Sequence, residues 1–220
     1  MTAHLTFEQV RQAHPSLPLD VIQRLGHEAG SIRPLVCDGL AGNRTRSGIY
    51  LSPQAVLDAG CTPASIALAE LLGGAQEEGG PNAGEWVIKY ARLSAGATLG
   101  RNRGAWCAFF ASWVLDQWAK LHGKDFAREG GARAVVRGLK RIAIEEIQVG
   151  DLAAWPSLTR APSWTGHVGI CVALTPEGVY TVEGNVDLIP RVDGVSARFF
   201  RRDLIRSDGA KPLYAGRLIL

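Results

Sequence analysis

Apolar residues recur at helical spacing in the first two thirds of the chain. The most regular case lies within residues 101–123, where apolar side chains fall at every third or fourth position and form one stripe. Its members are Cys107, Phe110, Val114, Trp118 and Leu121. Gly123 follows the stripe and is a typical helix stop. The segment therefore predicts the longest helix of the protein.

Shorter helices are predicted before it. Residues 5–29 predict two short helices separated by prolines, with Thr6 as an N-cap and Gln9 three residues later. Turn residues dominate the stretch that follows, up to about residue 53. The segment TPASIALAELL, which starts at Thr62, combines an N-cap, a proline at the first helical position and an Ala/Leu run. It predicts a helix at the start of a new structural unit.

The pattern changes to short strands after about residue 147. The segments VGDLAAWP, GHVGICVAL, GVYTVEGN, ARFFRR and PLYAGRLIL are short, apolar and separated by turn residues. Strands that follow a block of helices indicate the α+β class, with an antiparallel sheet. We therefore expect two units, a small helical module over residues 1–61 and an α+β domain over residues 62–220.

Composition excludes several classes of protein. Apolar residues make up 46% and charged residues 20% of the 220 residues, as in ordinary globular domains, and the net charge is only +3. No apolar run approaches the length of about 20 residues that spans a bilayer. The N-terminus resembles no secretory signal. We therefore expect no membrane insertion, no nucleic acid partner and a monomer.

The four cysteines form no CxxC pair, so a zinc ribbon or a redox motif is not indicated. Cys107 differs from the others because it falls in the first turn of the longest predicted helix. The partial positive charge of a helix N-terminus favours a thiolate there, and Arg101 and Arg103 lie just upstream. A buried core cysteine remains the alternative interpretation.

His167 begins the predicted strand 166–174, and side chains alternate along a strand. If this strand and the next form a hairpin with Ala173 opposite Val179, then Glu183 lies opposite Gly169 and Asn185 lies opposite His167. The small residues on that face would let a helix end approach closely. Cys107 would then complete a Cys–His–(Asn/Glu) arrangement, in which a base activates the nucleophile.

These segments resemble the CHAP family, the cysteine, histidine-dependent amidohydrolases/peptidases, which are papain-like peptidoglycan hydrolases of bacteria and phages. The motifs WCAFFASWVL, VGDLAAW, GHVGICVAL and EGN occur in the family's order, and the resemblance covers about residues 62–220. It implies a papain-like fold in which a helix that carries the nucleophile packs on an antiparallel sheet. The preceding segment, ALAELLGGAQEEGGPNAGEWVIKYA, also resembles the lead-in of the subgroup found in phage and prophage lysins.

The resemblance assigns roles to individual residues. Cys107 would be the nucleophile, His167 the general base and Glu183 the group that orients it, while Asn185 would hold the imidazole or the substrate. Two tryptophans would line a substrate groove, with buried packing as the alternative: Trp106 and Trp164. Asp151 of the Gly-Asp motif would be structural. No acidic calcium loop is present, so we expect no metal and no cofactor.

The expected activity is cleavage of an amide bond in bacterial peptidoglycan, either in a stem or cross-bridge peptide or between sugar and L-alanine. Residues 38–46 also resemble a segment of small peptidoglycan-binding domains, so the N-terminal module either binds the wall or is a plain helical appendage. Without a visible signal peptide, the enzyme would be made in the cytoplasm and reach the wall through a holin, a virion or a secretion machine. The alternatives are a non-catalytic wall-binding or virion structural protein that keeps the fold, and a cysteine enzyme with another substrate.

Overall fold

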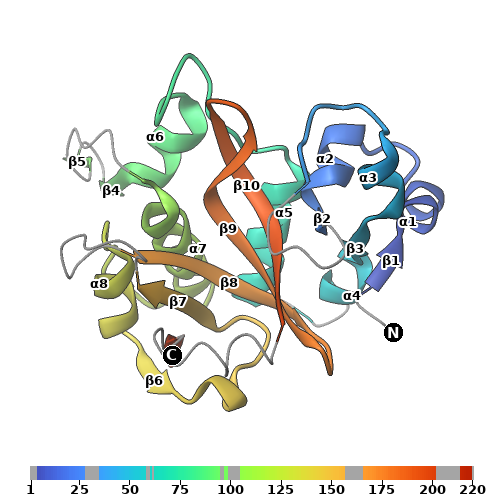
Figure 1. Ribbon diagram of the computed structural model, residues 1–220. Helices are drawn as coiled ribbons and strands as arrows, with labels where there is room; N and C mark the ends of the chain where they lie inside the picture. The colour runs from blue at the N-terminus through green and yellow to red at the C-terminus, as the bar shows by residue number, and fades with distance from the viewer. Residues whose placement is uncertain are drawn as a thin grey trace.

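The computed structural model describes residues 4–27, 35–57, 60, 62–94, 97–98, 105–156, 166–201 and 214–219. Its centre is a six-stranded antiparallel sheet with the strand order β10-β9-β8-β7-β11-β6. The strands are β6 (Lys140–Ile142), β7 (Leu152–Pro156), β8 (Gly166–Leu174), β9 (Gly178–Ile189), β10 (Val192–Arg201) and β11 (Tyr214–Arg217). The α+β class with an antiparallel sheet is therefore confirmed (Figure 1).

Among the described residues, four helices accompany this sheet, and the helix that starts near Thr62 and the long helix from Cys107 lie where the sequence predicts them. The four helices are α5 (Pro63–Leu72), α6 (Glu85–Ala91), α7 (Cys107–Leu121) and α8 (Ala132–Arg137), with a short 3-10 turn at Ile144–Glu146 and a small hairpin of β4 (Arg92–Ser94) and β5 (Ala97–Thr98). Helix α7 ends where Gly123 adopts a φ of 65°. The N–H of Gly123 bonds to the Lys120 carbonyl and that of Lys124 to the Ala119 carbonyl, which is a Schellman motif.

The N-terminal part is helical, with a small sheet of its own. It contains α1 (Phe7–Ala13), α2 (Leu19–Arg24), α3 (Asn43–Ser47) and α4 (Pro53–Leu57), and β1 (His4–Thr6), β3 (Ile49–Leu51) and β2 (Gly26–His27) pair in that order. The predicted capping of α1 is present, because the Thr6 hydroxyl accepts from the Gln9 N–H while the Gln9 side chain accepts from the Thr6 N–H. The small sheet was not predicted, because its strands are only two or three residues long.

The buried Gln23 side chain organises the segment that resembles a wall-binding motif. Its amide nitrogen donates to Asp38, to the Leu40 carbonyl and to Thr45, and its oxygen accepts from the Gly39 N–H. Gly39 has a φ of 73°, which glycine adopts at little cost. These bonds give the loop a fixed shape and say nothing of wall binding, which stays a prediction.

The two predicted units share one hydrophobic core. A single cluster of buried side chains includes Phe7 and Tyr50 of the N-terminal part together with Phe110 of α7 and Phe199 of β10. Figure 1 shows the N-terminal elements beside the β9–β10 edge of the large sheet. A boundary between residues 61 and 62 stays a prediction, and Cys61 lies outside the described residues.

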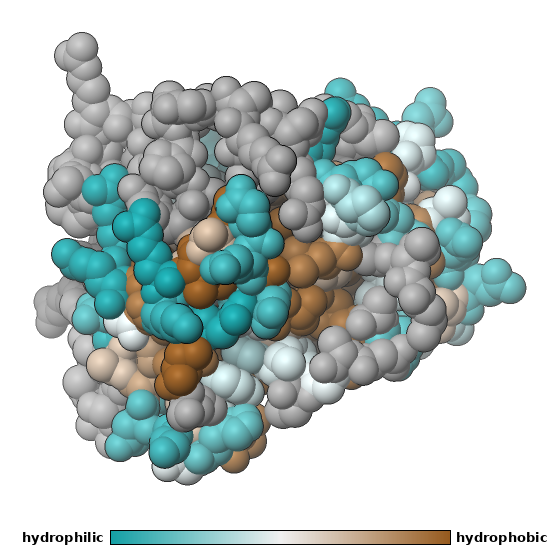
Figure 2. Space-filling model, turned by 90° about the horizontal axis from the view of Figure 1, so that it is seen from below, coloured by the Kyte–Doolittle hydropathy of each residue, from teal (hydrophilic) through white to brown (hydrophobic). Residues whose placement is uncertain are grey.

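A second, smaller cluster lies on the other face of the sheet, as strand alternation requires. Its buried members are Ile147, Ala153, Cys171, Val179 and Ala215. On the outer surface, the view of the molecule from below shows hydrophobic residues near the middle with hydrophilic residues beside them (Figure 2). The sheet is thus packed on both faces, and α7 contacts only one of them.

The β8–β9 hairpin differs from the predicted register near its turn. Ala173 pairs with Tyr180 and Leu174 pairs with Val179, so the prediction that Ala173 lies opposite Val179 is wrong. An irregularity between Cys171 and Ala173 inserts one extra residue into β8. Beyond it, the pairs Cys171–Thr181 and Ile170–Val182 follow the predicted register. The bulge therefore affects the turn and leaves the half of the hairpin that carries His167 and Glu183 as predicted.

Candidate functional site

The first turn of α7 places Cys107 at the boundary between helix and sheet. Cys107 is the first residue of α7 and is 3% exposed, and its Sγ lies 4.0 Å from the Gly166 carbonyl oxygen at the start of β8. Trp106 is the N-cap residue and is fully buried, with its ring stacked on Tyr90 at 5.6 Å. Backbone N–H groups at a helix start have no partner within the helix. The thiol therefore lies close to β8, beside N–H groups that have no acceptor within the helix.

The structure brings His167 and Glu183 together across the β8–β9 hairpin. The Nε2 atom of His167 lies 2.8 Å from Oε2 of Glu183, whose side chain is fully buried. Glu183 also accepts a hydrogen bond from the Thr181 hydroxyl, and Arg198 of β10 donates to its Oε2 at 3.4 Å. Because Glu183 occupies Nε2, the other ring nitrogen of His167 is the one left for the Cys107 thiol.

Opposing effects set the pKa values of this pair. Burial would lower the pKa of His167, but the Glu183 carboxylate and the hydrogen bonds with Cys107 and Glu183 outweigh it and raise the pKa to about 10. Burial would raise the pKa of Glu183, but the charges of Arg198 and His167 hold it below its ordinary value. At neutral pH the histidine is therefore an imidazolium and the glutamate a carboxylate.

Asn185 is near these residues but makes different contacts from those expected. Its Oδ1 accepts the backbone N–H of Trp106 at 2.5 Å, and its Nδ2 donates to Asp193 of β10. The expectation that it faces His167 assumed regular strand alternation. Asn185 has a φ of 60°, a left-handed conformation that asparagine tolerates, and this redirects its side chain. Its amide therefore holds the start of α7.

Glu77 completes this support and was not found from the sequence. It is buried, and its Oε1 accepts from the indole Nε1 of Trp106 at 2.9 Å and from the Asn82 N–H at 2.8 Å. Its Oε2 accepts from the Asp193 N–H at 3.2 Å. The glycine-rich loop that carries Glu77 has no periodicity, and its Glu-Glu pair reads as a solvated turn, so the sequence offers no signal for this role.

A glycine lets α7 approach the sheet closely. A Cβ atom on Gly184 would lie 2.6 Å from the Trp106 ring and 2.8 Å from Cβ of Phe110. The sequence prediction placed this approach on the face of β8 that carries Gly169 and Cys171. That was wrong, because α7 packs against the opposite face, where Val168 and Ile170 join its core cluster. The close approach occurs at Gly184 of β9.

Other predicted positions have different outcomes. The expectation that Trp106 lines a substrate groove is wrong, because its side chain is completely buried. Trp164, Arg101 and Arg103 lie outside the described residues. The Asp151 carboxylate accepts two hydrogen bonds from the Arg217 guanidinium of β11, at 2.7 and 2.8 Å, and one from the Gln148 N–H. These bonds connect β11 to the start of β7.

Metal and membrane features can be stated for the described ranges. Within residues 4–219, less the gaps given above, no group of three or more His, Cys, Asp or Glu side chains is placed to hold a metal ion. In the same ranges, no helix has the length and apolarity needed to cross a membrane. The cysteines described there, Cys37, Cys107 and Cys171, are buried free thiols.

Comparison with known families gives one match. The model of the CHAP domain family matches residues 99–185, about two fifths of the chain. The matched range begins just before α7 and ends at Asn185, so it contains Cys107, His167 and Glu183. No curated protein matches the chain.

Proposed function

We propose that the chain hydrolyses an amide bond of bacterial peptidoglycan with Cys107 as the nucleophile, since the model of the CHAP domain family matches residues 99–185. CHAP domains are in general cysteine- and histidine-dependent amidases and peptidases that act on peptidoglycan. The observation that carries the proposal is the contact of His167 with both Glu183 and Cys107 at the start of α7. A nucleophile, a base and an orienting carboxylate in contact form the arrangement that activates a thiol.

The first half-reaction forms a thioester. His167 holds the proton of the Cys107 thiol as an imidazolium, in an ion pair with the Cys107 thiolate. This thiolate attacks the carbonyl carbon of the scissile amide to give a tetrahedral intermediate. The raised pKa of His167 favours this ion pair at neutral pH. As the intermediate collapses, the C–N bond breaks and the imidazolium donates its proton to the leaving amine. Glu183 keeps the imidazole oriented and offsets its charge throughout.

The second half-reaction regenerates the enzyme. Neutral His167 takes a proton from water, and the hydroxide attacks the thioester carbonyl. The C–S bond breaks to give the Cys107 thiolate and a carboxylic acid, which loses its proton to solvent. In both steps the oxyanion needs hydrogen-bond donors. The Trp106 N–H is already donated to Asn185. The N–H of Cys107, at the first helical position, is therefore the donor we assign to the oxyanion.

The substrate bond is either in a stem or cross-bridge peptide or between the sugar and L-alanine. We propose that the protein acts at the bacterial cell wall, as a phage lysin, a virion enzyme or a secreted toxin would.

The test is digestion of purified sacculi, with mass spectrometry of the released fragments. We expect Cys107→Ala to lower the rate by about a thousandfold or more. The matched control is Cys171→Ala, which makes the same change at another buried free thiol and should digest sacculi at nearly the wild-type rate. New L-alanine amino termini would identify an amidase, and cut stems or bridges an endopeptidase.

Thiol chemistry gives a second readout on the same proteins. Burial raises the pKa of Cys37 to about 12, so this thiol stays protonated near neutral pH. Iodoacetamide should therefore modify Cys107 faster than Cys37. Equal digestion by wild type and Cys107→Ala, or no digestion by either folded protein, would contradict the proposed function.

A further inference from the structure

A cavity of about 800 Å³ lies beside His167. It is bounded by the end of β9, the turn into β10, the start of β10 and residues 35–36 of the N-terminal part. His167 and Asn185 are both on its boundary, so a substrate that reaches the histidine also borders this space. The other residues that line the cavity take no part in the proposed reaction.

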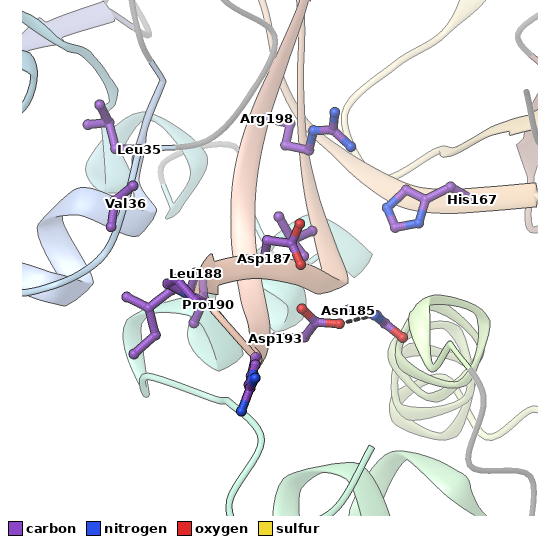
Figure 3. Close-up of a pocket in the computed structure, with 12 residues that line it drawn as sticks. Leu35, Val36, His167, Asn185, Asp187, Leu188, Pro190, Asp193 and Arg198 are labelled. Carbon is purple, nitrogen blue, oxygen red and sulfur yellow. Dashed lines mark hydrogen bonds between the residues drawn. The ribbon is translucent and has the colours of Figure 1, made fainter. Parts of the chain in front are cut away.

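One wall of the cavity is apolar. Figure 3 shows Leu35, Val36, Leu188 and Pro190 on the side away from His167. The Cys37 N–H donates to the Leu188 carbonyl at 2.9 Å, which fixes the N-terminal segment to β9. Val36 is 51% exposed, and it lines the cavity together with the buried Leu35 and Leu188. This wall suits the methylene groups of a ligand.

Two carboxylates lie between the apolar wall and the histidine, those of Asp187 and Asp193 (Figure 3). These residues are direct cross-strand partners in the β9–β10 ladder. Like charges placed opposite each other destabilise a sheet. Burial, the hydrogen bond with Asp187 and the charges of Glu77 and Asp187 raise the pKa of Asp193 to about 7. Near neutral pH the Asp193 carboxyl is therefore about half protonated, and a cation bound beside it would favour its ionised form.

Three basic residues line the cavity: His167, Arg191 and Arg198. Arg198 bonds to Glu183 at 3.4 Å and lies over the Phe200 ring at 5.3 Å. Arg191 is exposed in the turn between β9 and β10. Since no metal-binding group of three side chains occurs among the described residues, the carboxylate pair is better suited to an ammonium group than to a metal ion.

We propose that this cavity is a specificity subsite for a peptide residue whose aliphatic side chain ends in an ammonium group. The methylene chain packs against the apolar wall, and the ammonium lies between Asp187 and Asp193. The inference rests on the proposed function and deepens it, because it places a diamino acid of the stem peptide next to the scissile amide. It also gives residues 35–36 a part in substrate selection.

The experiment measures binding without turnover. Full-length Cys107→Ala protein is titrated in a calorimeter with the peptide L-Ala-γ-D-Glu-L-Lys-D-Ala and with the same peptide acetylated at the lysine Nε. We expect the acetylated peptide to bind about tenfold more weakly or worse. Asp187→Asn in the same background should reduce this difference. Asp125→Asn, in the exposed segment after α7, makes the same change outside the cavity and should preserve it.

Each outcome decides the proposal. Selective binding that Asp187→Asn abolishes supports the subsite. Equal binding of both peptides, binding of neither, or selectivity that survives Asp187→Asn in a protein with unchanged near-UV circular dichroism overturns it. Digestion of sacculi is decided separately by the Cys107-dependent assay. If the protein binds the two peptides selectively but does not digest sacculi, the subsite is supported and the proposed function is refuted. If it digests sacculi but binds the two peptides equally, the proposed function is supported and the subsite is refuted.

Discussion

The charge of Glu183 acts on an imidazole that remains 24% exposed. Glu183→Gln removes this charge and keeps an oxygen that can accept from the ring. We expect the pKa of His167 to fall from about 10 toward the ordinary histidine value of about 6.5. An NMR titration of the imidazole C–H protons measures this directly. Glu129→Gln, an exposed change away from the hairpin, should leave the titration as it is. If the pKa of His167 stays near 10 in Glu183→Gln, a group other than Glu183 is responsible for raising it.

The same pair makes stability depend on pH in a defined direction. A histidine with a raised pKa contributes its full stabilisation below the unfolded-state value of about 6.5 and loses it as pH rises through about 10. The glutamate, with a lowered pKa, contributes above its unfolded-state value and loses its contribution in acid. Urea unfolding should therefore show a larger difference between wild type and Glu183→Gln at pH 6 than at pH 10. A difference that grows toward pH 10 would contradict this assignment.

Sequence reasoning went furthest where residues lie within regular structure. Alternation along two strands was enough to place His167 beside Glu183, because both lie in the part of the hairpin beyond the bulge. It failed for Asn185, whose φ of 60° breaks the alternation. It could not find Glu77, whose partners come from α7, β10 and its own loop and share no sequence pattern with it.

At the scale of elements, the distance between α7 and β9 depends on Gly184. Gly184→Ala would place a Cβ atom 2.6 Å from the Trp106 ring, which is buried and cannot move aside freely. We expect a loss of about 1–3 kcal/mol in the free energy of unfolding, and a fall in kcat because Cys107 follows Trp106. Denaturant unfolding and sacculus digestion measure the two effects. The matched change Gly138→Ala, where a Cβ meets its first neighbour at 3.5 Å, should alter neither. Wild-type kcat in Gly184→Ala would show that the nucleophile's position does not depend on this contact.

Elements of strong periodicity were predictable and short ones were not. The apolar stripe that starts at Cys107 correctly predicted where α7 lies in the sequence, and β8 has the predicted bounds. Strands β9 and β10 extend beyond the predicted segments, because their paired ends carry polar residues such as Asp187 and Asp193 that read as loop. The edge strand β6 has the sequence Lys-Arg-Ile, which shows no apolar–polar alternation. It is a strand because it pairs with β11, and the sequence alone does not show this pairing.

At the scale of the whole molecule, a buried arginine joins the two predicted units. Arg24 is 2% exposed, and its guanidinium donates to the Ala75 carbonyl at 3.0 Å and to the Gln76 side chain at 2.6 Å. Its own carbonyl accepts from the Ser196 hydroxyl of β10 at 3.2 Å. Burial lowers the pKa of Arg24, while Asp20 and the bonds to residues 75–76 compensate for the desolvated charge. These contacts favour one cooperative unit over a tethered module.

Tryptophan fluorescence distinguishes one cooperative unit from a tethered module. All six tryptophans lie after residue 62, so the signal reports unfolding of the part of the chain after that residue. Arg24→Met leaves the Ala75 carbonyl and the Gln76 side chain without their buried donor, which should cost about 2–4 kcal/mol. If the chain unfolds as one unit, the fluorescence midpoint moves to lower urea, and the free energy of unfolding obtained from it falls by that amount. Arg11→Met, on the exposed face of α1, should stay within about 0.5 kcal/mol of wild type. An unchanged fluorescence midpoint in Arg24→Met, together with loss of far-UV helical signal at lower urea, would show that residues 1–61 unfold independently.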